Sequence, residues 1–414
     1  MVRKVEFAVV GAGPAGARAA ELLSGLGAGV LLLDPKAPWE KPCGGGLTPA
    51  AFDEIPELEE LKAFSRPVTT VRVEASPRVG VTVPLERPMW ILPRVDLARW
   101  QLDRALGAGA GHLRAKVEKI DREYGYWKLR TAEGDVLAPF LIGADGAASL
   151  VRRVAVPEFQ VELAPTRVAY PATRGAATET ALLKFYRGLA GYLWDFPRPD
   201  HRSVGIGVPN GTWRRPRLDG EIDAYRAVAD GCGCPDGLER AGAVIGTAQL
   251  GHGDYCALAG RDFALLGDAA GLADPLTGEG IQNALRSAGL LAQAWAGGGL
   301  DDYPRLARDA FEGEFRVARF IRRAVFESES GLRLIEKAVT SRAWYSVIVA
   351  AVNAVNEHDA TLSRLTWRWA RTYRGNRRSG ALTRPPLPGP ACACGCALEP
   401  TGSGAGCRPE TAAA

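Results

Sequence analysis

The chain has 414 residues, of which 47% are hydrophobic and 24% are charged, and its formal net charge is +4. This composition is typical of a soluble globular protein that is long enough for two or three domains. The net charge is too small to indicate nucleic-acid binding, and no run of about 18 apolar residues predicts a transmembrane helix.

The cysteine and histidine contents exclude further classes. Eight cysteines in 414 residues do not form a disulfide framework, so the expected compartment is a reducing cytoplasm. The four histidines have no metal-ligand spacing, which argues against a zinc site and a hydrolytic triad. We expect no signal peptide, because no charged segment and apolar core precede the first predicted strand.

A glycine-rich turn follows the first apolar segment. Residues 7–10 are typical of a buried parallel strand, and the turn Gly11-Ala12-Gly13-Pro14-Ala15-Gly16 leads into a helix expected to end near Leu26. In this pattern the first glycine permits a tight turn, the second lets a phosphate approach the backbone, and the third lets helix and strand pack closely. A second apolar strand, 29–33, ends at Asp34, whose carboxylate is placed to bind ribose hydroxyls. The order of these elements predicts dinucleotide binding.

A loop with three consecutive glycines comes next, after Asp34-Pro35. Its sequence, Lys41-Pro42-Cys43-Gly44-Gly45-Gly46, lets the backbone approach a flat or bulky group. A flexible surface loop is the simpler alternative. Strand patterns at 67–74 and 79–84 then indicate a second, antiparallel layer. Arg94 begins a helix expected over 95–106, where it either meets a phosphate or caps a loop.

The middle of the chain is rich in predicted strands. His112–Ile120 and Trp127–Thr131 are expected to be strands, with a turn at Glu133-Gly134. The apolar strand 140–143 ends in Gly143-Ala144-Asp145-Gly146, which is also the ordinary sequence of a strand-to-turn junction. Further strands are expected at 166–171, 181–187, 202–208 and 243–249.

Three aromatic residues alternate along one of these segments. Tyr192, Trp194 and Phe196 share one face of a strand, and such a face more often belongs to the core of a sheet than to a ligand site. Gly205 and Gly207 follow on the next strand, where their missing side chains let another group approach closely.

A late motif repeats the pattern of strand, acid and helix. An apolar strand ends in Gly267-Asp268-Ala269-Ala270-Gly271, and a loop then leads into a helix expected from Ile281 to about Gly297. Ligands of open α/β sheets bind outside the carboxyl ends of the strands. The N-terminus of this helix would favour negative charge at the loop Gly278–Gly280.

The last third of the chain is predicted to be helical over 303–375. Arginines and aromatic residues gather near its end, and they form either a solvated helix face or a surface that docks on an anionic membrane. The residues concerned are Arg364, Arg368, Arg371, Arg374, Arg377, Arg378, Trp367, Trp369 and Tyr373. The composition from about 379 predicts a disordered tail, and its cysteines, such as Cys392 and Cys407, lack the spacing of a standard zinc knuckle.

Taken together, these motifs resemble those of the para-hydroxybenzoate-hydroxylase-type FAD flavoproteins. Within that group the chain resembles the geranylgeranyl reductases, on Pro42-Cys43-Gly44-Gly45-Gly46 and on Y-x-W-x-F-P followed after seven residues by G-x-G. The resemblance covers roughly residues 5–375. The chain departs from the family pattern at Ala98, where an aspartate is frequent, and Cys232-Gly233-Cys234 and the cysteines of the tail have no counterpart.

The resemblance implies an α/β fold with a Rossmann-like FAD-binding domain, an inserted antiparallel-sheet substrate domain and a helical C-terminal region. We expect the FAD-binding domain to comprise 1–66, 90–160 and 256–300. The substrate domain is expected at 67–89 and 161–255, the helical region at 301–378 and the disordered tail at 379–414.

The resemblance also implies the site residues. The expected FAD contacts are Gly11, Gly13, Ala15, Gly16, Asp34, Pro35, Cys43, Gly44, Gly45, Arg94, Asp145, Asp268, Gly278, Gly280 and Ile281. A prenyl-binding cavity is expected at Tyr192, Trp194, Phe196, Gly205 and Gly207, which reverses the core-face interpretation. Cys43 is expected near the flavin as a candidate catalytic residue, although a buried inert thiol is the simpler alternative. A tyrosine or a bound water is an equal candidate for the proton donor.

The implied reaction is saturation of isolated C=C bonds in a polyprenyl chain by reduced FAD, with NADPH or ferredoxin as the electron donor. The prenyl group could be carried by a diphosphate, an ether lipid, a chlorophyll side chain or a quinone. The competing hypotheses are a flavin monooxygenase or halogenase of the same fold, and a flavin-binding interaction module without turnover. The expected location is the cytoplasm, with peripheral membrane contact as a hypothesis.

Overall fold

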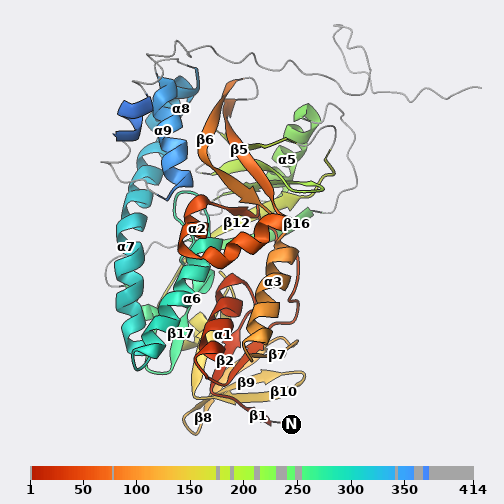
Figure 1. Cartoon of the computed structure of the whole chain (residues 1–414), viewed down its shortest axis with the longest axis vertical. Coiled ribbons are helices and arrows are strands. Elements are labelled where there is room, and N and C mark those ends of the chain that lie inside the picture. Colours follow the sequence, from red (N-terminus) through yellow and green to blue (C-terminus); the bar gives the residue numbers. More distant parts are fainter. Residues whose placement is uncertain are drawn as a thin grey trace, which may run out of the picture.

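The structure is a computed structural model that describes residues 2–76, 79–173, 178–186, 191–208, 215–229, 240–247, 254–340, 344–358 and 367–372. Two sheet-containing parts lie one above the other, and a long helix runs beside both (Figure 1). The segment Cys232–Cys234, the predicted tail and four of the six arginines near the C-terminus lie outside the described residues.

The lower part is a parallel sheet that carries the dinucleotide motif. Its strand order is β17 (Phe263–Leu265), β11 (Phe140–Gly143), β2 (Phe7–Val10), β3 (Val30–Leu33) and β7 (Gly111–Leu113). Strands β2 and β3 are buried along their whole length, as apolar runs in a parallel sheet covered on both faces should be. Helix α1 (Pro14–Gly25) packs against both α3 (Arg94–Gly107) and α6 (Ile281–Ala296).

The register of this sheet brings three separate motifs together. Val10 on β2 is aligned with Gly143 on β11, which is aligned with Leu265 on β17. Because these residues are the carboxyl ends of their strands, the three glycine-containing turns that follow them lie at one edge of the sheet.

A small sheet below it consists of β1 (Val2–Lys4), β10 (Gly134–Ala138), β9 (Tyr126–Thr131) and β8 (Lys119–Glu123). The single strand predicted over His112–Ile120 is wrong, because the chain there forms β7 in one sheet and β8 in another. Ala115 and Val117 in the connecting loop are buried, so their alternation reflects packing beneath the loop rather than strand pairing.

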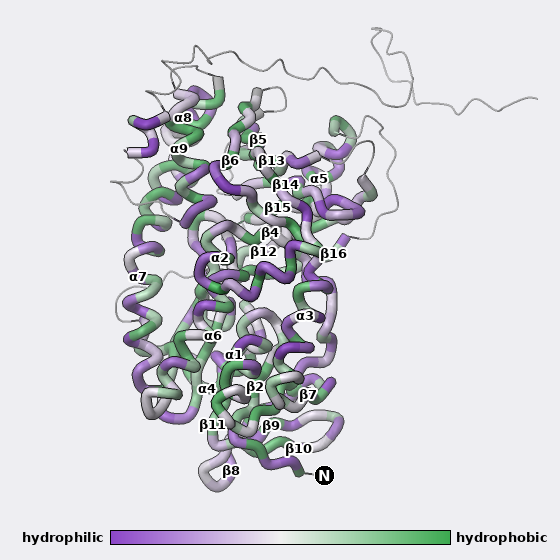
Figure 2. The backbone as a smooth tube through the Cα atoms, in the orientation of Figure 1, coloured by the Kyte–Doolittle hydropathy of each residue, from purple (hydrophilic) through white to green (hydrophobic). Residues whose placement is uncertain are grey.

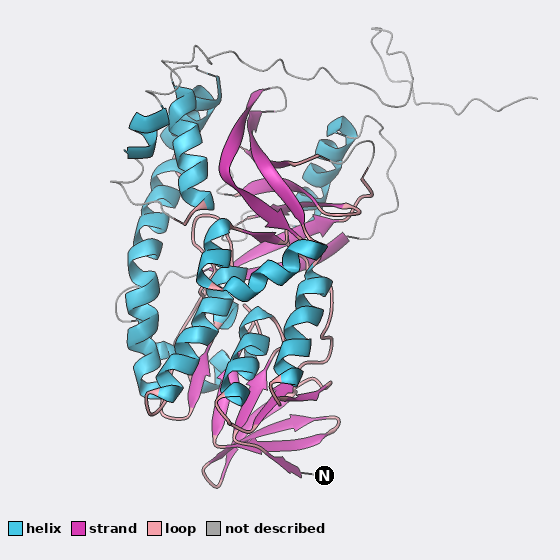
Figure 3. Ribbon diagram, viewed as in Figure 1, coloured by secondary structure: helices cyan, strands magenta, loops and turns pink. Residues whose placement is uncertain are grey.

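The upper part is an eight-stranded, mainly antiparallel sheet. Its order is β16 (Arg240–Thr247), β12 (Glu162–Ala169), β15 (Arg202–Gly207), β14 (Tyr192–Pro197), β13 (Thr180–Phe185), β5 (Arg66–Ser76), β6 (Val79–Ile91) and β4 (Gly46–Leu47). The pair β13–β5 is parallel, and the other neighbours are antiparallel. Figure 3 shows this sheet between the C-terminal helices and α5 (Arg215–Ala229).

The C-terminal helices connect the two parts. Helix α7 (Tyr303–Ile321) runs along the side of the molecule, and a π-helical turn, η6 (Arg322–Phe326), leads to α8 (Glu329–Thr340) and α9 (Tyr345–Asn356). Helices α8 and α9 pack on β6, and α8 also contacts β5. Figure 2 shows hydrophobic and hydrophilic segments alternating along α7, as expected of a helix with one buried face.

Short helices complete the described chain. They are α2 (Pro49–Glu54), η1 (Pro56–Phe64), α4 (Leu150–Ala155), η3 (Asp254–Leu258), η4 (Gly267–Ala270) and η5 (Leu300–Asp302). Within the described ranges, no helix combines the length and the apolar character that crossing a membrane requires.

A buried asparagine fixes α9 on β6. The Asn353 side chain donates to the carbonyl of Pro84 at 3.0 Å and accepts from the amide of Glu86 at 2.7 Å. Asn353→Ala leaves both backbone groups without this partner, at a cost of about 1–3 kcal/mol for each buried group that stays unpaired. We expect a clearly lower melting temperature by circular dichroism. Val228→Ala, at a side chain that is 67% exposed on α5, is the control and should leave it unchanged.

An unchanged melting temperature in Asn353→Ala would show that these two bonds do not hold α9 in place.

Candidate active site

A cavity of about 650 Å³ lies between the edge of the parallel sheet and the C-terminal helices. One part of its lining is glycine-rich backbone from the predicted motifs, including Gly13, Gly44–Gly46 and Gly278–Ile281. The other part is apolar and comes from β5, β6, β13, α8 and α9, with Val73, Leu183 and Ile348 among its members. The volume is within the range of small-molecule sites, which is about 300–1,000 Å³.

The first glycine turn has three distinct environments. Gly11 has a φ of +98°, and a Cβ on it would lie 2.3 Å from the carbonyl oxygen of Ala144. A Cβ on Gly16 would lie 1.9 Å from the carbonyl oxygen of Gly11, so helix and turn are in direct backbone contact. Gly13 borders the cavity, and a Cβ there would meet nothing within 4 Å. Helix α1 begins without a side-chain cap, so its first amide groups are available to an anion.

Asp34 lies beside this turn at the end of β3. Its Oδ2 accepts from the amide of Ala12 at 2.9 Å, and its Oδ1 accepts from the amides of Lys36 and Ala37. These bonds hold the carboxylate next to the glycine turn, the position expected of a ribose-binding acid. Neither Asp34 nor Pro35 borders the cavity itself.

Asp145 lies next to the start of α4 (Leu150–Ala155). Its Oδ2 accepts from the amides of Leu150 and Val151 at the start of α4, and burial raises the pKa of this carboxyl. The neighbours Ala144 and Gly146 border the cavity, whereas Asp145 does not. Oδ2 of this carboxylate is turned toward a helix N-terminus, whereas its buried Oδ1 has no hydrogen-bond partner among the described residues. The expected FAD contact of Asp145 therefore stays a prediction.

The late motif brings an acid and a helix N-terminus together. Asp268 Oδ2 accepts from Lys41 Nζ at 3.2 Å, and a Cβ on Gly280 would lie 3.0 Å from Asp268 Oδ1. Helix α6 has no side-chain cap at Gly280. Arg94 is buried at the cavity, and its Nε has no hydrogen-bond partner among the described residues.

These donors fit an anionic dinucleotide. Two uncapped helix N-termini and a buried guanidinium suit phosphates, and the glycines leave space that side chains would fill. The described residues contain no group of three His, Cys, Asp or Glu side chains arranged to hold a metal ion.

The Cys43 loop is fixed by buried polar side chains. The fully buried Arg198 donates to the carbonyl of Cys43 at 2.9 Å and to Glu40 at 2.7 Å. Ser203 donates to the same carbonyl at 3.0 Å and accepts from Trp194 Nε1 at 3.2 Å. The Cys43 thiol is half-buried and accepts from the Gly45 amide at 3.4 Å. Sequence reasoning missed Arg198 and Ser203, because neither belongs to a motif by itself.

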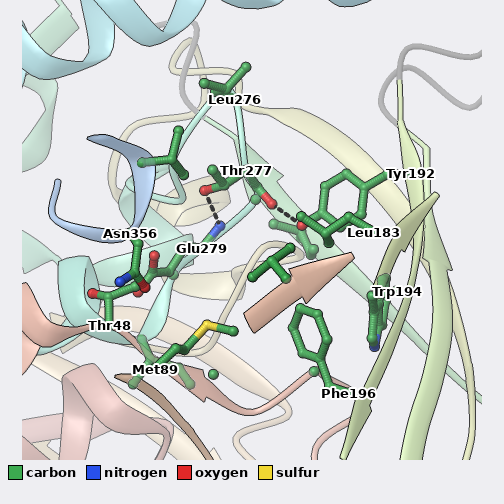
Figure 4. A pocket seen from close by; sticks show the side chains of 18 of the residues that line it. Thr48, Met89, Leu183, Tyr192, Trp194, Phe196, Leu276, Thr277, Glu279 and Asn356 are labelled. Carbon is green, nitrogen blue, oxygen red and sulfur yellow. Dashed lines mark hydrogen bonds between the residues drawn. The ribbon is translucent and has the colours of Figure 1, made fainter. Parts of the chain in front are cut away.

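The three alternating aromatic residues of β14 border the cavity, as the resemblance implied (Figure 4). A Cβ on Gly44 would lie 2.8 Å from the ring of Phe196, so the glycine loop packs directly on this face. The Tyr192 hydroxyl donates to the carbonyl of Thr277. Burial raises the pKa of Tyr192, so the hydroxyl stays protonated at neutral pH. The core-face interpretation of these residues is wrong, since they face a cavity.

Gly205 and Gly207 on β15 lie against side chains of the protein. A Cβ on Gly205 would lie 2.2 Å from Trp194 Cζ2, and one on Gly207 would lie 3.7 Å from Trp194 Cζ3. Neither glycine borders the cavity. The indole of Trp194 lies close against Gly205, whereas the atom nearest to a Cβ on Gly207 would be Thr166 Cγ2 at 3.3 Å. The expected substrate contact of the two glycines stays a prediction.

The sequence also gave no role to Glu279 and His358. His358 Nε2 lies 2.9 Å from Glu279 Oε2, although the residues are 79 positions apart in the sequence. Glu279 borders the cavity between two glycines of the late motif. The position of Glu279 inside the late motif was the one indication of a functional role that the sequence offered. The sequence could not show that His358, which follows α9, lies beside Glu279.

No protein-family model matches the chain. The chain is 30% identical over 355 residues to "Geranylgeranyl diphosphate reductase" of Rhodobacter capsulatus, which covers 79% of this chain and 85% of that protein. It is 29% identical over 410 residues to "Menaquinone reductase" of Mycolicibacterium smegmatis, which covers 89% and 97%.

Solved structures are similar in fold. A geranylgeranyl bacteriochlorophyll reductase-like protein from Thermoplasma acidophilum has a TM-score of 0.65 at 20% identity, and the match covers 92% of this chain and 100% of that one. The halogenase PltM has a TM-score of 0.63 at 18% identity, covering 91% and 84%. Both likenesses concern the fold alone.

The environment of Gly13 predicts a binding defect without a folding defect. Gly13→Ala should lower the affinity for an anionic dinucleotide by about tenfold or more, about 1.4 kcal/mol, because the methyl group would enter the space expected for its phosphates. The melting temperature of the apoprotein should not change, because no atom lies within 4 Å of the new Cβ. Titration of the apoprotein with FAD, followed by flavin fluorescence, measures this affinity.

Gly289→Ala is the matched control, because its Cβ also meets nothing within 4 Å but the residue lies outside the cavity lining. Equal FAD affinity in Gly13→Ala and Gly289→Ala would contradict the placement of the phosphates.

Proposed function

The chain belongs to the geranylgeranyl reductase family of flavoproteins, and on that premise we propose that it is an FAD-dependent reductase that saturates C=C bonds of a prenyl chain. The observation that carries this proposal is that the lining of one cavity joins the dinucleotide motifs to a long apolar surface. A polar or compact aromatic substrate would not need the apolar side chains contributed by β5, β6, α8 and α9.

The cofactor would be held by the groups that fit an anionic dinucleotide. The turn at Gly13 and the N-terminus of α1 would bind the phosphates, and Asp34 would bind ribose hydroxyls. The loop Gly278–Ile281 and the N-terminus of α6 would stabilise negative charge on the flavin ring. Reduced FAD, supplied with electrons by NADPH or ferredoxin, provides the hydride when bound.

The protein's own contribution is positioning and exclusion of water. An isolated alkene is a poor hydride acceptor, so its orientation against the cofactor and a dry environment matter most. Trp194 and Phe196 offer flat apolar surfaces beside the Cys43 loop, and Arg198 and Ser203 keep that loop in place. Cys43 is proposed as a residue near the flavin whose thiol contacts the reacting part of the substrate.

The proposal is tested anaerobically. The holoenzyme is reduced with dithionite and mixed with geranylgeranyl diphosphate, and flavin absorbance and product mass are followed together. We expect flavin reoxidation with the product mass rising in steps of two hydrogens. The same experiment with a menaquinone and with a geranylgeranylated ether lipid identifies the carrier that is reduced fastest.

The proposal would be contradicted if none of the three carriers reoxidised the flavin and the protein instead formed a hydroxylated or halogenated product that depended on oxygen. That result would favour the monooxygenase or halogenase alternative, whose fold the chain shares.

We also propose that the cavity opens onto a membrane surface. Trp344 and Trp369 border the cavity and are 39% and 43% exposed, and Trp367, two residues before Trp369, is 59% exposed. Exposed aromatic residues at a cavity mouth suit the lipid–water interface, where a prenyl chain could enter without crossing water. Arg371 stacks over the ring of Trp367, whereas Arg368 forms an ion pair with Glu86 at 2.5 Å. The two arginines therefore have different kinds of partner, an aromatic ring and a carboxylate.

Substitution of Trp344 and Trp367 by serine should weaken binding to anionic vesicles by about tenfold or more, because burying one such side chain in an apolar environment contributes about 1.5–3 kcal/mol. Vesicle co-sedimentation measures the effect. Tyr124→Ser is the control, since this residue is 94% exposed and lies between β8 and β9. Equal binding of the double variant and the control would contradict the membrane proposal.

A further inference from the structure

Saturation of each C=C bond consumes a proton as well as a hydride. The titratable residues that border the cavity are Lys41, Cys43, Arg94, Tyr192, Asp268 and Glu279. Lys41 and Asp268 pair with each other, and the Tyr192 hydroxyl is bound to a backbone carbonyl. Glu279 is bonded to His358, a titratable side chain outside the cavity lining.

The Glu279 carboxylate has one paired oxygen and one unpaired oxygen. Oε2 lies 2.9 Å from His358 Nε2, and the residue's amide donates to Thr277 Oγ1 at 3.1 Å. Oε1 is buried without a hydrogen-bond partner among the described residues. Figure 4 shows Glu279 beside Asn356 and Thr48 at the pocket. A buried carboxylate oxygen without a protein partner is placed to share a proton with a water or a substrate.

His358 also borders a second pocket. This pocket has a volume of about 320 Å³ and a polar lining: Asp53, Glu54, Gln282, Arg286, Glu314, Glu357 and His358, with Ala50. The side chain of Asp53 is 63% exposed and that of Glu314 is 44% exposed, so the pocket is open to water. His358 therefore lies between a solvated acidic pocket and the residue that borders the prenyl cavity.

The charges around His358 favour its protonated form. Burial lowers the pKa of His358, but Glu279, Asp274 and Glu314 raise it more strongly, to about 9. Arg286 is paired with Glu54 and Glu314, and Arg87 is paired with Asp53 and Glu357. The imidazolium is therefore present at neutral pH next to the carboxylate that needs a proton.

We propose that His358 and Glu279 form a proton relay from the polar pocket to the prenyl cavity, an inference that rests on the proposed function. The imidazolium gives its Nε2 proton to Glu279 Oε2, and the resulting carboxyl gives a proton to one alkene carbon, directly or through one water. The hydride adds to the other carbon. The imidazole keeps its Nδ1 proton, so its ring turns to expose the vacant Nε2 to the polar pocket, where it takes up a proton from the solvent. Each saturated bond thus takes up one solvent proton, and the relay itself undergoes no redox change.

Glu279→Gln and His358→Gln test the relay in the holoenzyme. Each variant should slow anaerobic flavin reoxidation by prenyl substrate at least tenfold, and the double variant should be no slower than the single ones, because they interrupt one path. In His358→Gln the affinity for FAD and for a saturated prenyl analogue should not change, because His358 lies outside the cavity lining. Glu133→Gln, in the turn between β9 and β10, is the control of equal charge and should match the wild type.

A second readout does not depend on turnover. NMR titration of the histidine rings should give His358 a pKa near 9 in the wild type and a value well below that in Glu279→Gln. Because the folded pKa lies above the usual value of 6.5, the pair stabilises the fold fully below pH 6.5, and this stabilisation is lost as the pH rises through about 9. The His358→Gln melting temperature should lack this pH dependence.

If the wild type reduces a prenyl substrate and both variants react at the wild-type rate, the relay is overturned and the proposed function stays intact. Absence of wild-type turnover with every prenyl carrier would overturn the proposed function, and the relay with it.

Discussion

The close backbone contact at the carboxyl edge of the parallel sheet is the constraint on which the site depends. Gly11, Gly16 and Ala144 approach so closely that a methyl group on either glycine would overlap a carbonyl oxygen. Because β2, β11 and β17 end in register, this contact also fixes the loop that carries Asp268. The edge therefore combines close backbone packing at Gly11 and Gly16 with open space at Gly13. The other elements of the molecule supply the cavity lining opposite this edge.

The eight-stranded sheet and the C-terminal helices supply the apolar surface opposite this edge. A buried guanidinium and a hydroxyl, from Arg198 and Ser203, hold the Cys43 loop against the aromatic face of β14. The loop thus forms the junction between the glycine-rich lining and the apolar lining. In our proposal the shape of the cavity positions an unreactive alkene against the cofactor and excludes water. The proton reaches the alkene by a separate route, from the polar pocket.

The sequence predicted most of what is local. The glycine turns, their strands and the aromatic face were predictable because each depends on a short pattern with a fixed spacing. The assignments of Asp145, Gly205 and Gly207 to ligands stay predictions, because an acid before a helix and a glycine in a strand have the same pattern whether a ligand or the protein itself fills the space. Contacts between distant segments, such as Glu279 with His358, have no local pattern and could not be predicted.

The most direct test of the account is a crystal structure of the protein with FAD and a saturated geranylgeranyl analogue. We expect the dinucleotide along Gly13 and the flavin ring beside Gly278–Ile281. The prenyl chain should pass Trp194 and Phe196 and continue between the sheet and helices α8 and α9. A prenyl chain bound outside this cavity, or a flavin ring separated from it by protein, would contradict the claim that one cavity joins cofactor and substrate.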